Sequence, residues 1–310
     1  MKRFLIKLGI TAAALLAVAW GLDLIITHNL WQSKVQMLDR YNTVYQSNTD
    51  YNVLIMGSSR GLVQYSPQIL DNILGVESYN LSCNGRCIDA EINIFNAYCR
   101  NHSLPKIVIQ NIDHGTLHMS NMYEREQYLP YITHDKDLYN ATRQTEQFNW
   151  SDRLIPLKRY AGYSEMFKEG LRIKNKMYNP YNEYKGYEGR ERQWDGSIFN
   201  TIEKESFTTN PQADTNFDHY LSYCKENGIQ VIFVYAPLYY GLTEKLGADT
   251  TIMFEHFQHY ADKYNCPTFN YLYDSICHDT AYFYNANHLN RRGAELFSTK
   301  LANDLKELLQ

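Results

Sequence analysis

The sequence predicts an α/β fold in which a mostly parallel five-stranded sheet lies between two layers of helices. Five short apolar runs alternate with helical segments, an order typical of a parallel sheet covered on both faces. Setting aside a membrane-type N-terminus leaves about 265 of the 310 residues, enough for one large domain or a core with an insertion. The alternation breaks from residue 114 to about residue 210, which indicates an insertion after the third strand.

The N-terminal segment is expected to be a membrane helix. Lys2, Arg3 and Lys7 precede an apolar run over Leu8–Leu22, and apolar residues resume after Asp23. Basic residues ahead of an apolar stretch fix the N-terminus in the cytoplasm and direct the following chain across the membrane. The body of the protein is therefore expected on the periplasmic, extracytoplasmic side.

Two interpretations of this segment remain open. Counted from Phe4 to Ile26 it reaches the ~20 residues that span a bilayer. Ala17-Val18-Ala19 fits a signal-peptide cleavage site, yet apolar residues continue past it. We favour an uncleaved signal-anchor over residues 1–28, followed by a juxtamembrane helix and linker over residues 29–49 and an α/β domain over residues 50–310.

The first three strands are expected between residues 50 and 113. Tyr51–Met56 is an apolar run that ends at a glycine. Ser66 and Pro67 suit the N-cap and first position of a helix, and Gly75 suits its C-terminal end. The other elements predicted here are the strand Glu77–Leu81, the helix Asp89–Arg100 and the strand Lys106–Ile112.

The alternation resumes after the insertion, which spans residues 114–210. The insertion is rich in Tyr, Asn and charged residues, with a short helix at Tyr163–Ile173. It follows the carboxyl end of strand three, the edge where open α/β sheets bind ligands, so we expect it to form a lid or wall of a site. The remaining predicted elements are the helix Asp214–Asn227, the strand Gln230–Tyr235, the helix Met253–Tyr264, the strand Pro267–Leu272 and the amphipathic helix Gly293–Leu309.

Two motifs near opposite ends of the α/β region indicate acyl-transfer chemistry. Gly-Ser-Ser-Arg over residues 57–60 follows the first strand, which places Ser59 at the start of a helix, where backbone N–H groups favour negative charge. A serine needs a base before it acts as a nucleophile. His288 precedes the last helix, in a loop that can return to the same sheet edge. Each motif alone is ordinary turn or capping chemistry; together they predict a Ser-His pair.

These motifs resemble blocks of the SGNH/GDSL hydrolase superfamily, and most closely its membrane-anchored branch of polysaccharide O-acetyltransferase-like and D-alanyl-transfer-like proteins. VLIMGSSR is similar to the nucleophile block, YNLSCNGRC to the glycine block and NANHLNRRGAELF to the terminal Asp-x-x-His block. The resemblance covers residues 50–113 and 212–310. It implies a flavodoxin-like three-layer α/β/α fold, Ser59 as nucleophile, His288 as base, and the N–H groups of Ser59 and Gly85 as oxyanion hole.

The sequence departs from this family pattern in two places. Asn285 replaces the aspartate three residues before the histidine; an amide orients the imidazole but does not stabilise its cation, so Asp279 or a main-chain carbonyl is an alternative partner. The family's Gly-x-Asn block is missing after strand three. Asn111 falls inside that strand, and Asn84 beside Gly85 is the alternative donor. Losing one oxyanion donor costs about 10²–10³ in rate.

Three further residues near this edge of the sheet are weaker candidates for the site. Asp113 and His114 end the third strand. They could serve as an alternative base or contact the substrate, although capping the insertion is the more ordinary role. Arg60 suits an anionic substrate group or, more ordinarily, a surface salt bridge.

A net charge of -4 without a long basic run argues against a nucleic-acid partner. The six cysteines form no CxxC pair, so neither a zinc site nor a cofactor is predicted, and most are expected to be buried thiols.

The leading hypothesis is a membrane-anchored bacterial serine esterase or O-acyltransferase acting on acyl esters of cell-envelope or extracellular glycans. The aromatic insertion, within a chain of 27 tyrosines, suits a sugar-binding surface. The competing hypothesis is a catalytically inactive relative that serves as a glycan-binding or envelope-assembly module. Asn285 and the missing asparagine block favour this second hypothesis.

Overall fold

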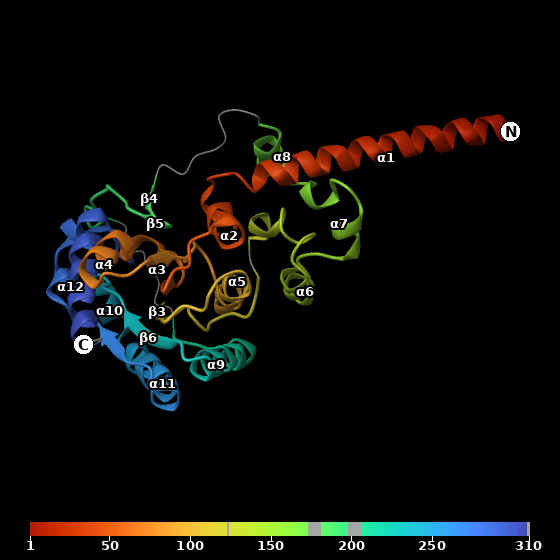
Figure 1. Ribbon diagram of the computed structural model, residues 1–310. Coiled ribbons are helices and arrows are strands. Elements are labelled where there is room, and N and C mark those ends of the chain that lie inside the picture. Colours follow the sequence, from red (N-terminus) through yellow and green to blue (C-terminus); the bar gives the residue numbers. More distant parts are fainter. Residues whose placement is uncertain (123, 173–180, 198–205, 309–310) are drawn as a thin grey trace. The chain divides into compact units, whose positions relative to one another are not determined.

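The computed structural model describes residues 1–122, 124–172, 181–197 and 206–308 (Figure 1). The chain divides into two compact units, and each has its own core. Unit 1 comprises Met1–Thr43 and Glu124–Asn179, and unit 2 comprises Val44–Tyr123 and Pro180–Gln310.

Unit 2 is built on a five-stranded sheet with the order β2-β1-β3-β6-β7. All its pairings are parallel; Val108 on β3, for example, lies opposite Leu54 on β1 and Val231 on β6. The predicted α/β fold with a parallel five-stranded sheet is confirmed, and each predicted strand is present, most of them one or more residues shorter. The strands are β1 (Val53–Met56), β2 (Ser78–Asn80), β3 (Ile107–Asn111), β6 (Gln230–Tyr235) and β7 (Thr268–Asn270).

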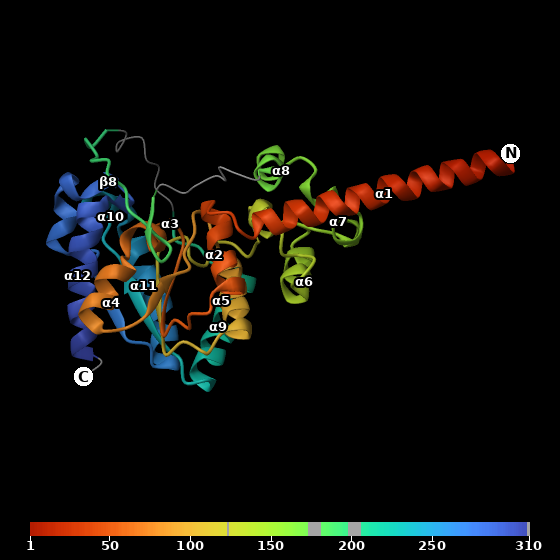
Figure 2. The same cartoon turned by 45° about the horizontal axis from the view of Figure 1, so that its top comes forward.

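Helices cover both faces of this sheet. Figure 2 shows α4 and α12 on one side and α5 and α9 on the other. The two hairpins of unit 2 are β4 (Asn182–Tyr184) with β5 (Tyr187–Glu188) and β8 (Phe283–Asn285) with β9 (His288–Leu289). The helices are α3 (Ser59–Gln64), α4 (Pro67–Leu74), α5 (Ile88–Asn101), α9 (Pro211–Glu226), α10 (Tyr240–Leu246), α11 (Ala248–Tyr264) and α12 (Arg291–Leu308), with short 3-10 turns at Ser275–His278 and Thr280–Tyr282.

Local signals account for α4 particularly well. Ser66 is its N-cap, Pro67 is its first residue, and Gly75 follows it with φ at 68°. Proline lacks only an N–H group that the first helical turn leaves without an intrahelical partner, and glycine accepts the left-handed conformation without steric cost. These are the start and stop predicted from the sequence.

Unit 1 is helical. Its long first helix, α1 (Lys2–Leu30), contains an 18-residue window with a mean hydropathy of 2.0, which is long and apolar enough to cross a membrane. The predicted helix Tyr163–Ile173 is present as α8, except that Ile173 lies outside the described residues. The other elements are α2 (Gln36–Gln46), whose last three residues are assigned to unit 2, and α6 (Lys136–Gln144), α7 (Trp150–Leu154), α8 (Ser164–Leu171) and 3-10 turns at Arg125–Tyr128 and Lys158–Tyr160.

The C-terminal part of α1 packs into unit 1. A Cβ atom on Gly170 of α8 would lie 3.1 Å from Cα of Ile26, so the two helices approach closely at this glycine. Asn29 donates a hydrogen bond to the Gly170 carbonyl at 2.7 Å, and Thr27 Oγ1 lies 2.7 Å from the Tyr160 hydroxyl. The end of α1 is therefore fixed by side-chain contacts.

Candidate active site

Ser59 stands at the carboxyl edge of the sheet, directly after β1. The strand ends at Met56, Ser58 is the N-cap residue of α3, and Ser59 is its first residue. A Cβ atom on Gly57 would lie 2.9 Å from Cβ of Asn111 and 3.3 Å from Cα of Gly61. The sharp passage from strand to helix therefore needs glycine at position 57.

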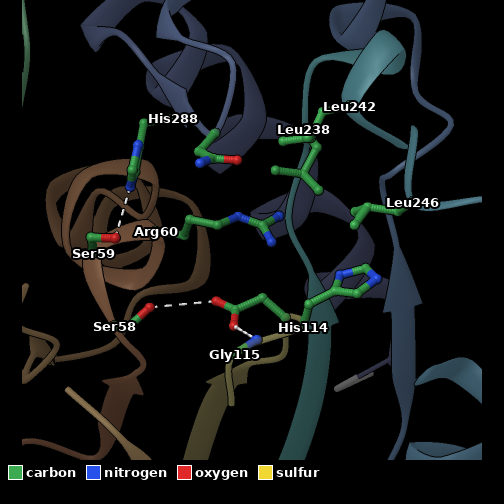
Figure 3. Close-up of a pocket in the computed structure, with 11 residues that line it drawn as sticks. Ser58, Ser59, Arg60, His114, Gly115, Leu238, Leu242, Leu246 and His288 are labelled. Carbon is green, nitrogen blue, oxygen red and sulfur yellow. Dashed lines mark hydrogen bonds between the residues drawn. The ribbon is translucent and has the colours of Figure 1, made fainter. Parts of the chain in front are cut away.

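His288 reaches Ser59 from the other end of the chain. Its Nε2 lies 2.7 Å from Oγ of Ser59 (Figure 3). Its Nδ1 lies 2.9 Å from Oδ1 of Asn285. Asn285 and His288 are opposite each other in the β8–β9 hairpin. The hairpin thus carries the imidazole and its partner together, whereas Asp279 caps the nearby 3-10 turn through the Ala281 amide.

The Asn285 amide fixes the tautomer of His288. Its Oδ1 also accepts a hydrogen bond from the backbone N–H of Asn287 at 2.9 Å. Only the oxygen of the amide can accept from an N–H group, so this contact sets the amide orientation. Nδ1 of His288 must then donate to Oδ1, and Nε2 is left free of a proton and able to accept from the Ser59 hydroxyl.

The environment keeps this imidazole neutral. Burial, together with the positive charges of Arg60 and Arg190, lowers the pKa of His288 to about 3. The ring also stacks on Tyr284, with ring centroids 5.2 Å apart. Burial disfavours the charged form of a basic group, so the His288 imidazole stays unprotonated at neutral pH but is a weak base.

Gly85 and Asn84, the other residues predicted for the oxyanion hole, lie in one turn, whereas Asn111 belongs to strand β3. Gly85 lines a cavity together with Ser59 and has φ at 65°, a conformation that favours glycine. Asn84 precedes it in the same turn. Asn111 lies inside β3 and is buried; its Nδ2 donates to Asp113 at 3.1 Å, and its Oδ1 accepts from Tyr65 at 2.8 Å.

Asp113 caps the start of the predicted insertion and also faces Ser58. Its Oδ1 accepts from the backbone N–H of Gly115 at 2.9 Å, and its Oδ2 accepts from the Ser58 hydroxyl at 3.4 Å. The two adjacent serines therefore differ in their partners. Ser58 is bonded to a carboxylate, and Ser59 is bonded to the imidazole.

Arg60 is a buried residue, and the expectation of a surface salt bridge is wrong. Its side chain is 6% exposed, and it donates to the carbonyl of Ala236. Among the residues that the structure describes, its Nε has no hydrogen-bond partner. The guanidinium points into the cavity beside Ser59 (Figure 3), because α3 turns this face toward the end of β6.

Two cavities meet at Ser58, Ser59 and Asp113. The larger, of about 250 Å³, has an apolar wall formed by Leu238, Leu242 and Leu246. The smaller, of about 190 Å³, is lined by Gly85, Arg86, Glu91 and Thr116, and we call it the polar cavity after the last three of these side chains. One cavity suits an aliphatic group and the other a group rich in hydroxyls.

Several cavity residues were not predicted from the sequence. No helix was expected between β6 and residue 253, so α10 and its leucines were missed, although Leu242 and Leu246 have the i, i+4 spacing of one helix face. Glu91 falls within the predicted helix Asp89–Arg100, and no role in the site was predicted for it. Burial raises its pKa to about 8, and Gln110 donates to its Oε2 at 2.8 Å.

Comparison with known proteins finds only a distant structural similarity. No family model and no curated protein matches the chain. Among solved structures it is similar to a predicted acylhydrolase from Bacteroides fragilis NCTC 9343, with 12% identity and a TM-score of 0.39, over 86% of this chain and 94% of that chain. At this TM-score the similarity carries no argument about the fold or the activity of this chain.

Proposed function

We propose that the protein is a serine esterase or O-acyltransferase that forms an acyl-enzyme on Ser59. The observation that carries the proposal is the chain of contacts from the Asn287 amide through Asn285 and His288 to the Ser59 hydroxyl. A nucleophile bonded to a base, with the base oriented by a third group, is the arrangement that activates serine in acyl transfer.

The reaction follows from these positions. Oγ of Ser59 attacks the ester carbonyl while Nε2 of His288 takes its proton. The N–H groups of Ser59 and Gly85 stabilise the oxyanion of the tetrahedral intermediate. The intermediate collapses, the alcohol leaves with the proton from Nε2, and the acyl group stays on Ser59. Water or a sugar hydroxyl then attacks the acyl-enzyme, again through His288, and releases Ser59.

The two cavities support separate binding places for the acyl group and the sugar part of the substrate. The leucine-lined cavity suits a short aliphatic acyl group, because apolar surface is buried there without loss of hydrogen bonds. The cavity lined by Arg86, Glu91 and Thr116 offers donors and acceptors for a sugar. Glu91 keeps its proton at neutral pH, since its pKa is raised to about 8, and it is then able to donate to a hydroxyl. We therefore propose acylated glycans as substrates.

The N-terminal helix supports a location at the membrane. Lys2, Arg3 and Lys7 precede the apolar part of α1, a charge asymmetry that favours an N-terminus in the cytoplasm. The proposed arrangement is a signal-anchor with the α/β domain on the periplasmic side, facing cell-envelope glycans.

Labelling with a fluorophosphonate tests the nucleophile. The probe phosphonylates an activated serine, so the wild type is expected to label and Ser59→Ala is expected to lose the label. Ser58→Ala is the matched control, because it removes the adjacent hydroxyl without touching His288, and it is expected to label like the wild type. An unlabelled wild type, or full labelling of Ser59→Ala, contradicts the assignment.

One observation favours a second function, a glycan-binding module without turnover. Asn285 gives His288 no negative charge, and burial leaves the pKa of this base at about 3. The binding function requires that neither the wild type nor a variant with a restored acid hydrolyses esters, while an acetylated glycan still binds. Calorimetric titration of the hydrolytically silent protein with such a glycan measures this directly.

A further inference from the structure

The outer surface of α1 stays apolar past the acidic residue that interrupts its sequence. From Leu8 to Ile25 its exposed side chains are apolar except Thr11, a span of roughly 27 Å at 1.5 Å per residue, close to the thickness of a bilayer core. Asp23 is turned inward and is 2% exposed, whereas Leu24 and Ile25 are 62% and 52% exposed.

Contacts inside unit 1 hold Asp23 in this orientation. Its carboxylate accepts a hydrogen bond from Arg159 at 2.5 Å and another from the backbone N–H of Leu157 at 2.7 Å. Arg159 is itself buried and also donates to Thr27 at 2.8 Å. A buried pair of this kind is stable only with its partners in place, so the segment around Leu157 is fixed at the level of Asp23 on α1.

The helix α7, just before this segment, carries an exposed apolar patch. Trp150, Leu154 and Ile155, which we call the α7 patch, are 65%, 61% and 46% exposed. Asn149 and Asp152 close a capping box at the start of α7. The side chains therefore project from a capped, ordered turn, with Trp150 and Leu154 on one helix face.

The helix α7 lies toward the apolar half of α1. Both views show α7 beside α1 and reaching further toward its N-terminal end than α6 or α8 does (Figures 1 and 2). Its neighbours Arg153 and Lys158 carry positive charge, which suits lipid phosphates. Tryptophan with flanking basic residues is typical of the interface between hydrocarbon and water.

We propose that the α7 patch inserts into the interfacial layer of the same membrane leaflet from which α1 emerges, with lipid as its partner. The inference rests on the proposed anchoring by α1 and goes beyond it. Unit 1 is then held at two places, by the spanning helix and by α7 beside it. A second contact of this kind prevents rotation of unit 1 about the axis of α1, which a single helix allows.

Quenching by brominated lipid tests this with the full chain in phosphatidylcholine vesicles. The emission of Trp150 is obtained as the difference between the wild type and Trp150→Phe. We expect brominated acyl chains to reduce this emission at least about two-fold relative to ordinary chains, since interfacial tryptophan contacts the acyl boundary. Asn140→Trp in the Trp150→Phe background is the control, because Asn140 is exposed on α6, and its emission is expected to be unquenched.

The outcomes separate docking from anchoring. If the chain resists a carbonate wash but Trp150 is quenched no more than the reporter at position 140, the α7 patch does not face lipid, and the proposal is overturned in favour of solvent or a protein partner. If the wash removes the chain from the vesicles, the anchoring itself fails, and docking fails with it. Retention together with selective quenching of Trp150 supports both.

Discussion

Asn285 decides how well this site can work. Its amide oxygen is fixed by the Asn287 N–H and therefore selects the productive tautomer of His288. It performs the orienting role of a carboxylate but adds no negative charge. In the proposed reaction, the cationic imidazole would therefore form near Arg60 and Arg190 without an acidic partner on Nδ1, which predicts a slow enzyme.

Asn285→Asp is expected to raise ester hydrolysis. The carboxylate keeps the bond to Nδ1 and stabilises the imidazolium, so we expect kcat/KM for 4-nitrophenyl acetate to increase at least about tenfold. Asn287→Asp is the matched control: it adds the same charge two residues away, without changing the group on Nδ1. An equal effect of both variants would assign the gain to general electrostatics, and no gain in either would support the binding module.

The acid limb of the pH profile is expected to lie unusually low. His288 must be neutral to act as a base, and its pKa is lowered to about 3, so kcat/KM should hold between pH 8 and about 4 and fall below it. Arg60→Gln removes one of the positive charges that lower this pKa, and the limb should move to higher pH. Steady-state rates over pH 3–8 measure the shift, with circular dichroism to confirm folding. A profile centred near 6.5 in the wild type contradicts the burial argument.

At the scale of elements, the sequence predicted what local chemistry dictates. β1, β6 and α4 follow from apolar runs and from caps within a few residues, and the position of Ser59 at the start of α3 follows from β1. The leucines of α10 were missed because the segment between β6 and α11 is short and opens without a capping residue. The burial of Arg60 depends on the Ala236 carbonyl, which is 176 residues away in the chain, and no local pattern reports such a contact.

The helix α10 is expected to set the preference for acyl length. Leu242 is 6% exposed and forms part of the apolar cavity wall, so Leu242→Phe fills space that a longer acyl chain would occupy. We expect the ratio of kcat/KM for 4-nitrophenyl hexanoate to that for the acetate to fall about tenfold, the scale of one to three kcal/mol in a hydrophobic pocket. Leu296→Phe, on the exposed side of α12, should leave the ratio unchanged. If Leu242→Phe also leaves it unchanged, the acyl group binds elsewhere.

At the scale of the whole molecule, the site is assembled from distant parts. Ser59 and His288 are 229 residues apart, and the parallel sheet returns both to one edge. That pairing was predictable because motif order and topology constrain it. The polar cavity was not, because Glu91 is a helix residue whose role appears only when α5 packs beside β3 and Gln110.

Glu91 also links the site to the stability of the fold. Its pKa is raised from 4.5 to about 8, chiefly by burial, so between these pH values the folded state holds a proton that the unfolded state releases. This contribution is complete below pH 4.5 and is lost as pH rises through about 8. The protein should therefore lose stability toward alkaline pH.

Glu91→Gln is expected to remove this loss, because the amide keeps the shape of the protonated acid and cannot ionise. Between pH 5 and pH 9 the wild type should lose about 1–3 kcal/mol more unfolding free energy than the variant does. Urea denaturation at both pH values measures the difference, and Glu255→Gln, an exposed site on α11, is the control that should behave like the wild type. Parallel pH dependence of Glu91→Gln and the wild type would show that Glu91 is already ionised in the fold, and the polar cavity would then present a negative charge to its ligand instead of a proton donor.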